Sequence, residues 1–289
     1  MADPKEFEER PDLSEAERHR MSEGIQLKAA LVHEIIREEG EEELARTLNA
    51  LAWSGLAAGL SMGFSLVVEG LLHHHLPDAL WRPLIESFGY TTGFIIVILG
   101  RQQLFTENTL KGVIPVLTRR DRASLVALGR LWGIVLLANL VGAGLFATLA
   151  ANAPAFDPNL HRDFITIGEE AAQGGFIALF VKAVLAGWLI GLMVWLLPGA
   201  GSSRLIVILL ITYIVALGGF AHIIAGSVEV LYLVLSGERS FLSYLLDYVV
   251  PVLAGNIVGG SALVAMLNHA QVRTEVPAAG HAADEPAGE

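Results

Sequence analysis

A polar segment, "GRQQLFTENT", interrupts a long apolar stretch of this chain. It supplies a guanidinium on Arg101, a hydroxyl on Thr106 and a carboxyl on Glu107. A second interruption, "LGGFAHIIAGS", places His222 inside another apolar stretch. Such groups in an apolar setting mark ion or proton pathways. No nucleophile–base pair, metal-ligand cluster or glycine-rich phosphate loop accompanies them. We therefore expect a transport path without catalytic residues, cofactor or metal, and no enzyme.

The composition is that of a membrane protein. Of the 289 residues 53% are hydrophobic and only 17% are charged, against about 25% charged in soluble domains. Fourteen acids and seven bases lie in residues 1–46, and four acids and one base lie in residues 273–289, so the tails carry nearly all of the net charge of −11. This distribution gives no reason to expect a nucleic-acid partner. There are no cysteines, which excludes thiolate chemistry and a disulfide framework.

Six apolar stretches are long enough to cross a bilayer, which takes about 20 residues. The predicted spans are 48–72, 86–118, 125–150, 172–197, 203–235 and 243–268. The second and fifth run to about 33 residues, too long for one straight crossing and too short for two. Each contains one of the two interruptions. We therefore predict an all-α membrane protein with six transmembrane helices, of which the second and fifth are broken at mid-membrane.

The chain divides into three parts. Residues 1–46 form an acidic extension, in which helical spacing of apolar residues predicts an amphipathic interfacial or subunit-contacting helix. Residues 47–270 form the transmembrane channel domain, and residues 271–289 form a disordered tail. Arginines concentrate in the loop between spans two and three and at Arg204 and Arg273, on one side of the predicted topology. The positive-inside rule then places both tails in the cytoplasm.

The two halves of the predicted channel domain repeat. Gly100 and Gly218, 118 residues apart, begin the two interruptions, and "NLVGAG" in span three answers "NIVGGS" in span six at an offset of 117. Each half has three spans, so the halves enter the membrane in opposite directions and form inverted repeats. Inverted repeats with broken helices place the binding site at the midplane breaks. We interpret the two N-x-V-G motifs themselves as close packing through small residues.

Charged residues near the breaks have structural as well as functional interpretations. Glu107 and Lys111 are four residues apart with the acid first, the favourable order for an ion pair on a helix. Arg101 and Glu229 each lie about one turn from a break. They either pair across the repeat interface, or Arg101 lines the path and recruits anions. Lys182, in the outer half of span four, either concentrates anions at an outer vestibule or extends to the outer surface.

The polar residues at the breaks suit anion binding. We predict that Thr106 is the N-cap of the half-helix after the first break, whose positive end then favours an anion. Burial favours neutral imidazole at His222, which could donate a hydrogen bond to an anion or pass it a proton. The alternative is a histidine satisfied by a neighbouring helix. Three consecutive histidines at 73–75 are not expected to bind metal, because adjacent helical residues face different ways.

Several motifs together resemble the formate/nitrite transporter family. They are "LFTENT" after a glycine, "GLMVW" in span four, "HIIAG" in span five and the two N-x-V-G motifs. The resemblance covers about residues 48–270, and the acidic extension with "GRQQLFTEN" resembles a less-studied bacterial inner-membrane branch. It implies an aquaporin-like fold and a homopentamer in the inner membrane, with one pore in each subunit. It also implies small monovalent anions, such as formate, nitrite or hydrosulfide, as solutes.

The resemblance also implies residue roles. Leu104 and Phe105 would form an apolar constriction faced by Val194, which a neutral conjugate acid crosses more easily than a bare ion. His222 would be the pore histidine, within hydrogen-bonding reach of Thr106.

Departures from the family pattern concern the solute. Family members often have asparagine where Gly191 and Gly226 stand, and a small residue where Glu107 follows the loop threonine. The leading interpretation is a passive or proton-linked channel for small monovalent anions. Two alternatives stay open: a pore of altered selectivity, for a neutral solute or another ion, and a non-transporting membrane scaffold or sensor on the same fold.

Overall fold

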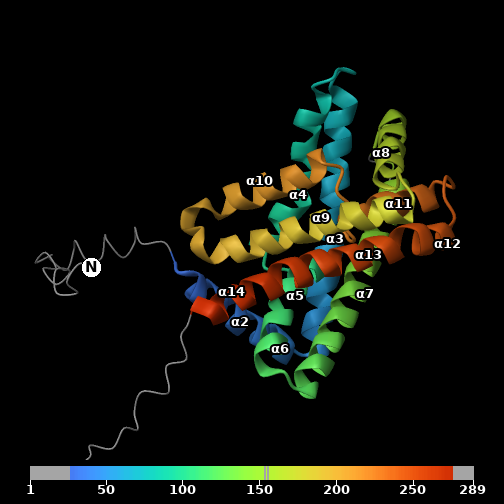
Figure 1. Cartoon of the computed structure of the whole chain (residues 1–289). Helices are drawn as coiled ribbons and strands as arrows, with labels where there is room; N and C mark the ends of the chain where they lie inside the picture. The colour runs from blue at the N-terminus through green and yellow to red at the C-terminus, as the bar shows by residue number, and fades with distance from the viewer. Residues whose placement is uncertain (1–26, 153, 155, 276–289) are drawn as a thin grey trace, which may run out of the picture.

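The computed structural model describes residues 27–152, 154 and 156–275, and all regular elements in this part of the chain are helical (Figure 1). The predicted tails lie largely outside the described residues. The α-helices are α2 (Ala29–Ala45), α3 (Leu48–His75), α4 (Arg82–Leu99), α5 (Phe105–Lys111), α6 (Val113–Arg119), α7 (Arg122–Asn152), α8 (Pro158–Ala171), α9 (Phe176–Leu196), α10 (Arg204–Leu217), α11 (Ala225–Leu235), α12 (Phe241–Ser243), α13 (Val250–Ile257) and α14 (Leu267–Glu275). Two 3-10 turns, η2 (Leu197–Gly199) and η3 (Gly201–Ser203), connect α9 to α10, and two π-helical segments, η4 (Tyr244–Val249) and η5 (Val258–Met266), flank α13.

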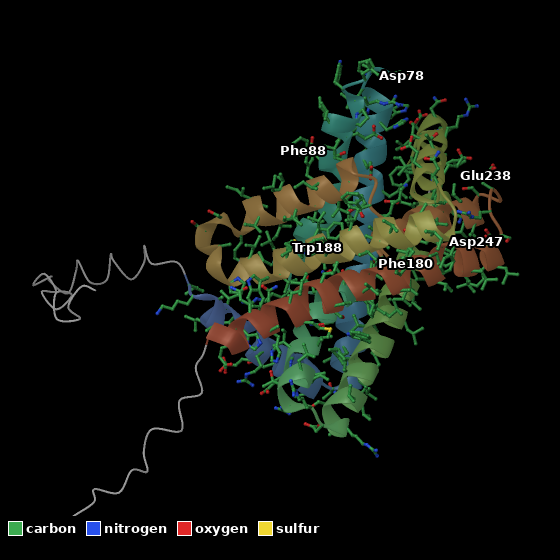
Figure 2. All side chains as sticks on the ribbon, in the orientation of Figure 1. Asp78, Phe88, Phe180, Trp188, Glu238 and Asp247 are labelled. Carbon is green, nitrogen blue, oxygen red and sulfur yellow. The ribbon has the colours of Figure 1, made fainter. Side chains whose placement is uncertain are left out.

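Long apolar helices form the body of the molecule. Within the described residues, four helical segments are long and apolar enough to cross a membrane: Leu48–His75, Arg122–Asn152, Phe176–Gly199 and Phe241–Val272. Large apolar side chains such as Trp53 and Ile177 are exposed on their outer faces. Figure 2 shows Phe180 and Trp188 along the length of α9, whereas the acidic side chain of Asp78 lies beyond the end of a helix. Apolar faces of this extent fit contact with lipid or with another subunit.

The helix stops at both interruptions. One break separates α4 from α5, and the other separates α10 from α11. α4 and α10 end in the same hydrogen-bonding pattern, in which the N–H of Gln102 or Phe220 bonds to the carbonyl five residues back at 2.9 Å. The residue before each donor has left-handed backbone geometry, with φ of 52° at Arg101 and 58° at Gly219. This is the Schellman helix end, which normally places glycine at the left-handed position.

Asn139 on α7 holds the first break in place. Its Oδ1 accepts the N–H of Phe105 at 2.9 Å. Its Nδ2 donates to the carbonyls of Gly55 at 2.7 Å and Gln103 at 2.8 Å. The side chain is fully buried, so it satisfies backbone groups that leave the helix and have no water to bond.

Asn256 on α13 does the same for the second break. Its Oδ1 accepts the N–H of Ile223 at 2.8 Å, and its Nδ2 donates to the carbonyls of Ala183 and Ala221 at 2.8 and 2.9 Å. The two asparagines are the first residues of the two N-x-V-G motifs. The glycines of these motifs do pack closely on the neighbouring helix, where a side chain on Gly142 would meet Gly59 Cα at 2.9 Å. The motifs therefore have two roles: their glycines allow close helix packing, and their asparagines bind the backbone of the breaks.

The two ends of the described chain meet at one end of the molecule. α2 and α14 lie side by side (Figure 1), joined by a 2.9 Å hydrogen bond between His33 Nε2 and His269 Nδ1. Arg119 at the end of α6 pairs with Glu41 on α2 at 3.0 Å. Gly40 lies against the backbone carbonyl of Lys111, where a side chain would not fit. α2 is therefore a helix, as predicted, and it packs against the body of its own chain. Its predicted contact with the membrane interface or with another subunit stays a prediction.

One described helix, α8, was not predicted from the sequence. It lies between α7 and α9 in the chain and buries Leu160, Phe164 and Ile167. The sequence marks the start of this helix with an N-cap residue followed by proline. Asp157 caps the helix by accepting the N–H of Asn159 at 2.7 Å, and proline stands at the first helical position.

Candidate functional site

The two breaks meet through a hydrogen bond. Thr106 Oγ1 lies 2.7 Å from His222 Nε2, and both residues are 1% exposed. Phe94 of α4 packs edge-on against the imidazole at 4.9 Å between ring centroids. The contact between threonine and histidine that the family resemblance implied is therefore present, and it joins the two halves of the chain at their helix breaks.

The hydrogen bonds fix the state of the imidazole. His222 Nδ1 accepts the backbone N–H groups of Ile224 at 3.3 Å and Ala225 at 3.2 Å, at the start of α11. Nδ1 therefore carries no proton, and in the neutral ring the proton sits on Nε2 and is donated to Thr106. The Thr106 hydroxyl then keeps its own hydrogen to offer to a solute.

The expectation that Thr106 is a helix N-cap is wrong. The cap position of α5 belongs to Leu104, whose side chain makes no capping bond, and Thr106 is the second helical residue. The backbone N–H of Phe105, the first residue of α5, is instead accepted by the side-chain oxygen of Asn139 on α7. The hydroxyl of Thr106 is thereby left for His222.

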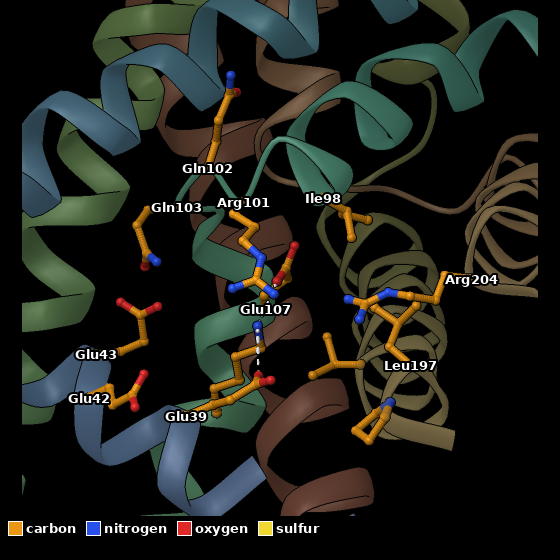
Figure 3. Close-up of a pocket in the computed structure, with 13 residues that line it drawn as sticks. Glu39, Glu42, Glu43, Ile98, Arg101, Gln102, Gln103, Glu107, Leu197 and Arg204 are labelled. Atoms are coloured by element: carbon orange, nitrogen blue, oxygen red, sulfur yellow. Dashed lines mark ion pairs between the residues drawn. The ribbon is translucent and has the colours of Figure 1, made fainter. Parts of the chain in front are cut away.

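A cavity of about 140 Å³ lies at the first break on the side of α2, and we name it the inner cavity because the predicted topology places that side in the cytoplasm. Figure 3 shows its side chains converging from α2, the break and the end of α9. Lys111 bridges Glu107 at 3.2 Å and Glu39 at 3.3 Å, so the ion pair expected from the four-residue spacing is present and is extended to α2. The residues lining the cavity are Glu39, Glu42, Glu43, Ile98, Arg101, Gln102, Gln103, Glu107, Lys111, Val194, Leu197, Pro198 and Arg204.

Arg101 lines this inner cavity, and Figure 3 shows it extending from the break toward Glu107. Among the described residues it forms no ion pair within 4.0 Å. A left-handed conformation costs a non-glycine residue about 1–2 kcal/mol. Arginine at this position is therefore not explained by the backbone, and the guanidinium is held at the mouth of the path at some expense of stability.

An outer cavity of about 100 Å³ lies at the second break. It shares no lining residue with the inner cavity, and His222 lines the outer cavity alone. Three glutamates line it, and no lysine or arginine does so among the described residues. The lining residues are Glu69, Tyr90, Ile167, Glu170, Ala171, Val215, Ala216, Gly219, Phe220, Ala221, His222, Gly226, Glu229 and Tyr248.

The predicted pair between Arg101 and Glu229 is wrong. The two residues line different cavities, one at each break, and no ion pair joins them. Glu229 is 4% exposed and makes no hydrogen bond or ion pair with the rest of the described chain. Glu69 was missed by sequence reasoning, although an acid inside an apolar span is itself a signal of function.

Two glycine positions have a structural explanation. A side chain on Gly226 would collide with the hydroxyl of Tyr248, which bonds to the carbonyl of His222 at 3.3 Å. Tyr248 thus occupies the place beside His222 that an asparagine at 226 would need. Gly191 lies against Val264, whose Cγ2 would be 2.8 Å from an added Cβ. Both departures from the family pattern are matched by bulk on the facing helix.

The predicted constriction residues are deeply buried. Leu104, Phe105 and Val194 are at most 2% exposed. Val194 lines the inner cavity, whereas the ring of Phe105 packs edge-on against Trp132 at 5.9 Å. Their role as a gate stays a prediction.

Lys182 and the histidine tract at 73–75 line neither the inner nor the outer cavity. Lys182 lines neither cavity, and its ammonium lies 3.5 Å from the carbonyl of Gln173 in an exposed position. The histidine tract ends α3, where His73 bonds to Glu86 at 2.7 Å and His74 to Asp163 at 2.8 Å. The recruitment of anions by Lys182 therefore stays a prediction, as does its alternative, an extension to the outer surface.

Comparisons with known proteins agree with this architecture. The family model for formate/nitrite transporters matches residues 30–270. The chain belongs to the formate/nitrite transporter family. The inner membrane protein YfdC of Escherichia coli is 43% identical over 249 residues, covering 86% of this chain and 80% of the relative. The formate channel BtFdhC of Bacillus thuringiensis is 23% identical over 245 residues, covering 82% and 92%. Among solved structures, a pentameric formate channel with formate bound aligns with a TM-score of 0.62 at 21% identity, covering 80% of this chain and 96% of that chain. This likeness shows a shared all-helical transporter fold.

Proposed function

We propose that this member of the formate/nitrite transporter family is a channel for small monovalent weak-acid anions, formate and nitrite among them, with transport linked to protons. The observation that carries the proposal is the Thr106–His222 hydrogen bond between the two breaks, with one cavity at each break. A buried hydroxyl hydrogen and a neutral imidazole can hold a small anion or its acid. The imidazole donates its Nε2 proton to Thr106, so it does not act as a base that would activate this hydroxyl as a nucleophile.

The scaffold supports six transmembrane helices in two inverted repeats. The contacts of Asn139 and Asn256 with their breaks are matched at offsets of 117 and 118 residues. Such symmetry places a solute site at the midplane breaks. We further propose a homopentamer in a bacterial inner membrane with both tails cytoplasmic. A pentameric formate channel shares the fold, and the terminal helices α2 and α14 lie at the arginine-rich end of the molecule.

The test is flux into liposomes that contain the purified protein. Labelled formate and nitrite should enter faster than into empty liposomes, with glycerol and ammonium as controls. Thr106→Val removes the hydroxyl but keeps the shape and should lower formate flux several-fold. Thr118→Val is the matched control, because the Thr118 hydroxyl bonds only to the carbonyl of Ile114 at 2.9 Å in α6. Wild-type liposomes that pass neither formate nor nitrite would overturn the proposal.

One observation favours a pore of altered selectivity as the second candidate. The outer cavity carries glutamates without a basic residue among its described lining, an unfavourable entrance for a bare anion. Ammonium flux that exceeds formate flux in the same liposomes would support this candidate.

A further inference from the structure

The outer cavity holds carboxyl groups that the described chain does not neutralise. Glu229 on α11 is 4% exposed, lines the cavity and has no hydrogen-bond or ion-pair partner among the described residues. Glu69 on α3 lines the same cavity, and its Oε2 is buried without a hydrogen-bond partner within the described part of the chain. A buried, unpartnered carboxyl aimed into a cavity is a group that awaits a ligand.

The surroundings of Glu229 do not supply a cation. Arg82, near the mouth, is shared between Asp78 and Glu86 at 3.6 Å each, and His73 is bonded to Glu86. α7 packs against α11 but carries its bases Arg122 and Arg130 at the opposite end, near α2. The titratable groups around Glu229 are Glu69 and His73 from α3, Arg82, Glu86 and Tyr90 from α4, His161, Asp163 and Glu170 from α8, His222 from the break, and Tyr244 and Tyr248 from η4.

Two ionised carboxylates in so dry a place would repel each other without compensation. An uncompensated charge within a membrane protein is costly, and like charges in one site cannot both stay ionised. Glu170 on α8, at the rim of the outer cavity and outside the predicted spans, also favours its protonated form. Burial, and then repulsion from Glu86, raises the pKa of its carboxyl. The pair therefore takes up either a proton or a small cation.

His222 is poorly placed to be the proton donor. An imidazolium would need a hydrogen on Nδ1, which already faces the N–H groups of Ile224 and Ala225. Three hydrogens would then converge with no acceptor. A proton for the solute must come from another group in the outer cavity.

We propose that Glu69 and Glu229 hold an exchangeable proton in the outer cavity, and that a weak-acid anion takes it there and reaches Thr106 and His222 as the neutral acid. The inference rests on the proposed transport of weak acids. The O–H bond of the protonated carboxyl breaks as a new O–H bond forms on the anion, which leaves a carboxylate on the protein. A proton from the outer solution then restores the carboxyl through the exposed rim at Glu170, and the neutral acid releases its proton in the wetter inner cavity.

The first test observes the proton directly. Infrared difference spectra of the assembled protein at neutral pH should show the carbonyl stretch of a protonated carboxylic acid. Glu229→Gln or Glu69→Gln should remove or shift this band, and Glu229→Asp should keep a carboxylic acid band. Glu169→Gln is the matched control, because Glu169 is an exposed neighbour on α8 that does not line the cavity. It should leave the spectrum unchanged.

The second test measures formate uptake into liposomes while the outer solution is acidified. Wild type and Glu169→Gln should be stimulated, and Glu229→Gln should lose several-fold of this stimulation. His222→Asn should keep the pH response even if its rate falls. If His222→Asn loses the pH response while Glu229→Gln retains it, the histidine is the proton donor and the proposal is wrong.

Remaining outcomes separate the two proposals. The absence of a protonated carboxyl band from wild type, with ammonium flux abolished by Glu229→Gln, would identify a cation site and overturn the proton site. A band unchanged in Glu69→Gln, Glu229→Gln and the double variant would also overturn it. A band removed by Glu229→Gln in a protein that moves neither formate nor nitrite would support the proton site and defeat the proposed function instead.

Discussion

Lys111 and Glu229 occupy corresponding places in the two halves of the chain, 118 residues apart, near the first turn after each break. Lys111 sits between two acids, Glu107 and Glu39, in the inner cavity. Glu229 sits with other acids in the outer cavity and has no partner among the described residues. Equivalent backbone positions therefore carry opposite charges, one neutralised and one not.

The comparison separates the scaffold from the chemistry. Backbone geometry at the two breaks is nearly the same, from the left-handed residue at each helix end to the asparagine that binds each loop. The side chains differ: arginine stands at 101 where glycine stands at 219, and leucine stands at 104 where histidine stands at 222. A symmetric scaffold thus carries an inner cavity of mixed charge, in which Lys111 is paired, and an outer cavity of unpaired acids, so the two sides of the path differ chemically.

The largest effect should come from breaking the shared scaffold. Asn139→Leu leaves the buried N–H of Phe105 and the carbonyl of Gln103 unsatisfied, each costing ~1–3 kcal/mol, or about 4 kcal/mol in total. Asn256→Leu should cost the same, because its three bonds are equivalent. Thermal unfolding in detergent measures both, with the exposed Asn152→Leu on α7 as control. Clearly unequal losses would show that the halves do not share this support.

The next largest effect should come from breaking the ion pair between Lys111 and Glu107. Lys111→Met leaves Glu107 without its cation and should destabilise the protein by about 3 kcal/mol, the lower end for a broken buried pair, because the pair keeps some contact with solvent. Adding Glu107→Gln should restore most of the loss. Glu229→Gln should cost little, because no interaction within the described chain is broken. If the unfolding midpoint fell as much for Glu229→Gln as for Lys111→Met, the contrast between a paired Lys111 and an unpaired Glu229 would be wrong.

A smaller effect is expected at the left-handed positions. Arg101→Gly relieves the backbone and should stabilise the protein by about 1 kcal/mol, whereas Gly219→Ala should destabilise it by a similar amount. Arg101→Gly should also slow formate entry from the inner side at low ionic strength, where the guanidinium attracts anions unscreened. Unfolding and flux measured on the same preparations check both expectations. A destabilised Arg101→Gly with unchanged flux would show that the arginine serves the fold.

The smallest effect concerns the helix that borders the inner cavity. Burial lowers the pKa of His33 on α2 below its usual 6.5. An undocked α2 therefore binds a proton more readily than the docked helix, so docking is strongest above about pH 6.5 and weakens as the pH falls below it. Hydrogen exchange over residues 29–45, corrected for intrinsic rates, should speed up on acidification. His33→Gln should remove the pH dependence, and a wild-type α2 with constant protection would argue against the role.

Much of the path follows from local sequence. Polar residues in stretches too long for one crossing marked both breaks, and an acid four residues before Lys111 marked that ion pair, because helix length and spacing are local properties. The contact between Thr106 and His222 was predicted from the family resemblance. The start of α8 was equally local, carried by Asp157 and the proline after it, and could have been found.

The grouping of charges was decided by the tertiary structure alone. Spacing suggested that Arg101 and Glu229 meet, yet they line different cavities, and Glu229 instead shares a cavity with Glu69, 160 residues away in the chain. The role of Asn139 was equally hidden, because its three partners lie on another helix and on the break. Periodicity determines that a segment is helical and which residues share its face. The direction in which that face points depends on how the helices cross, and those crossings are set by close contacts between distant glycines and asparagines.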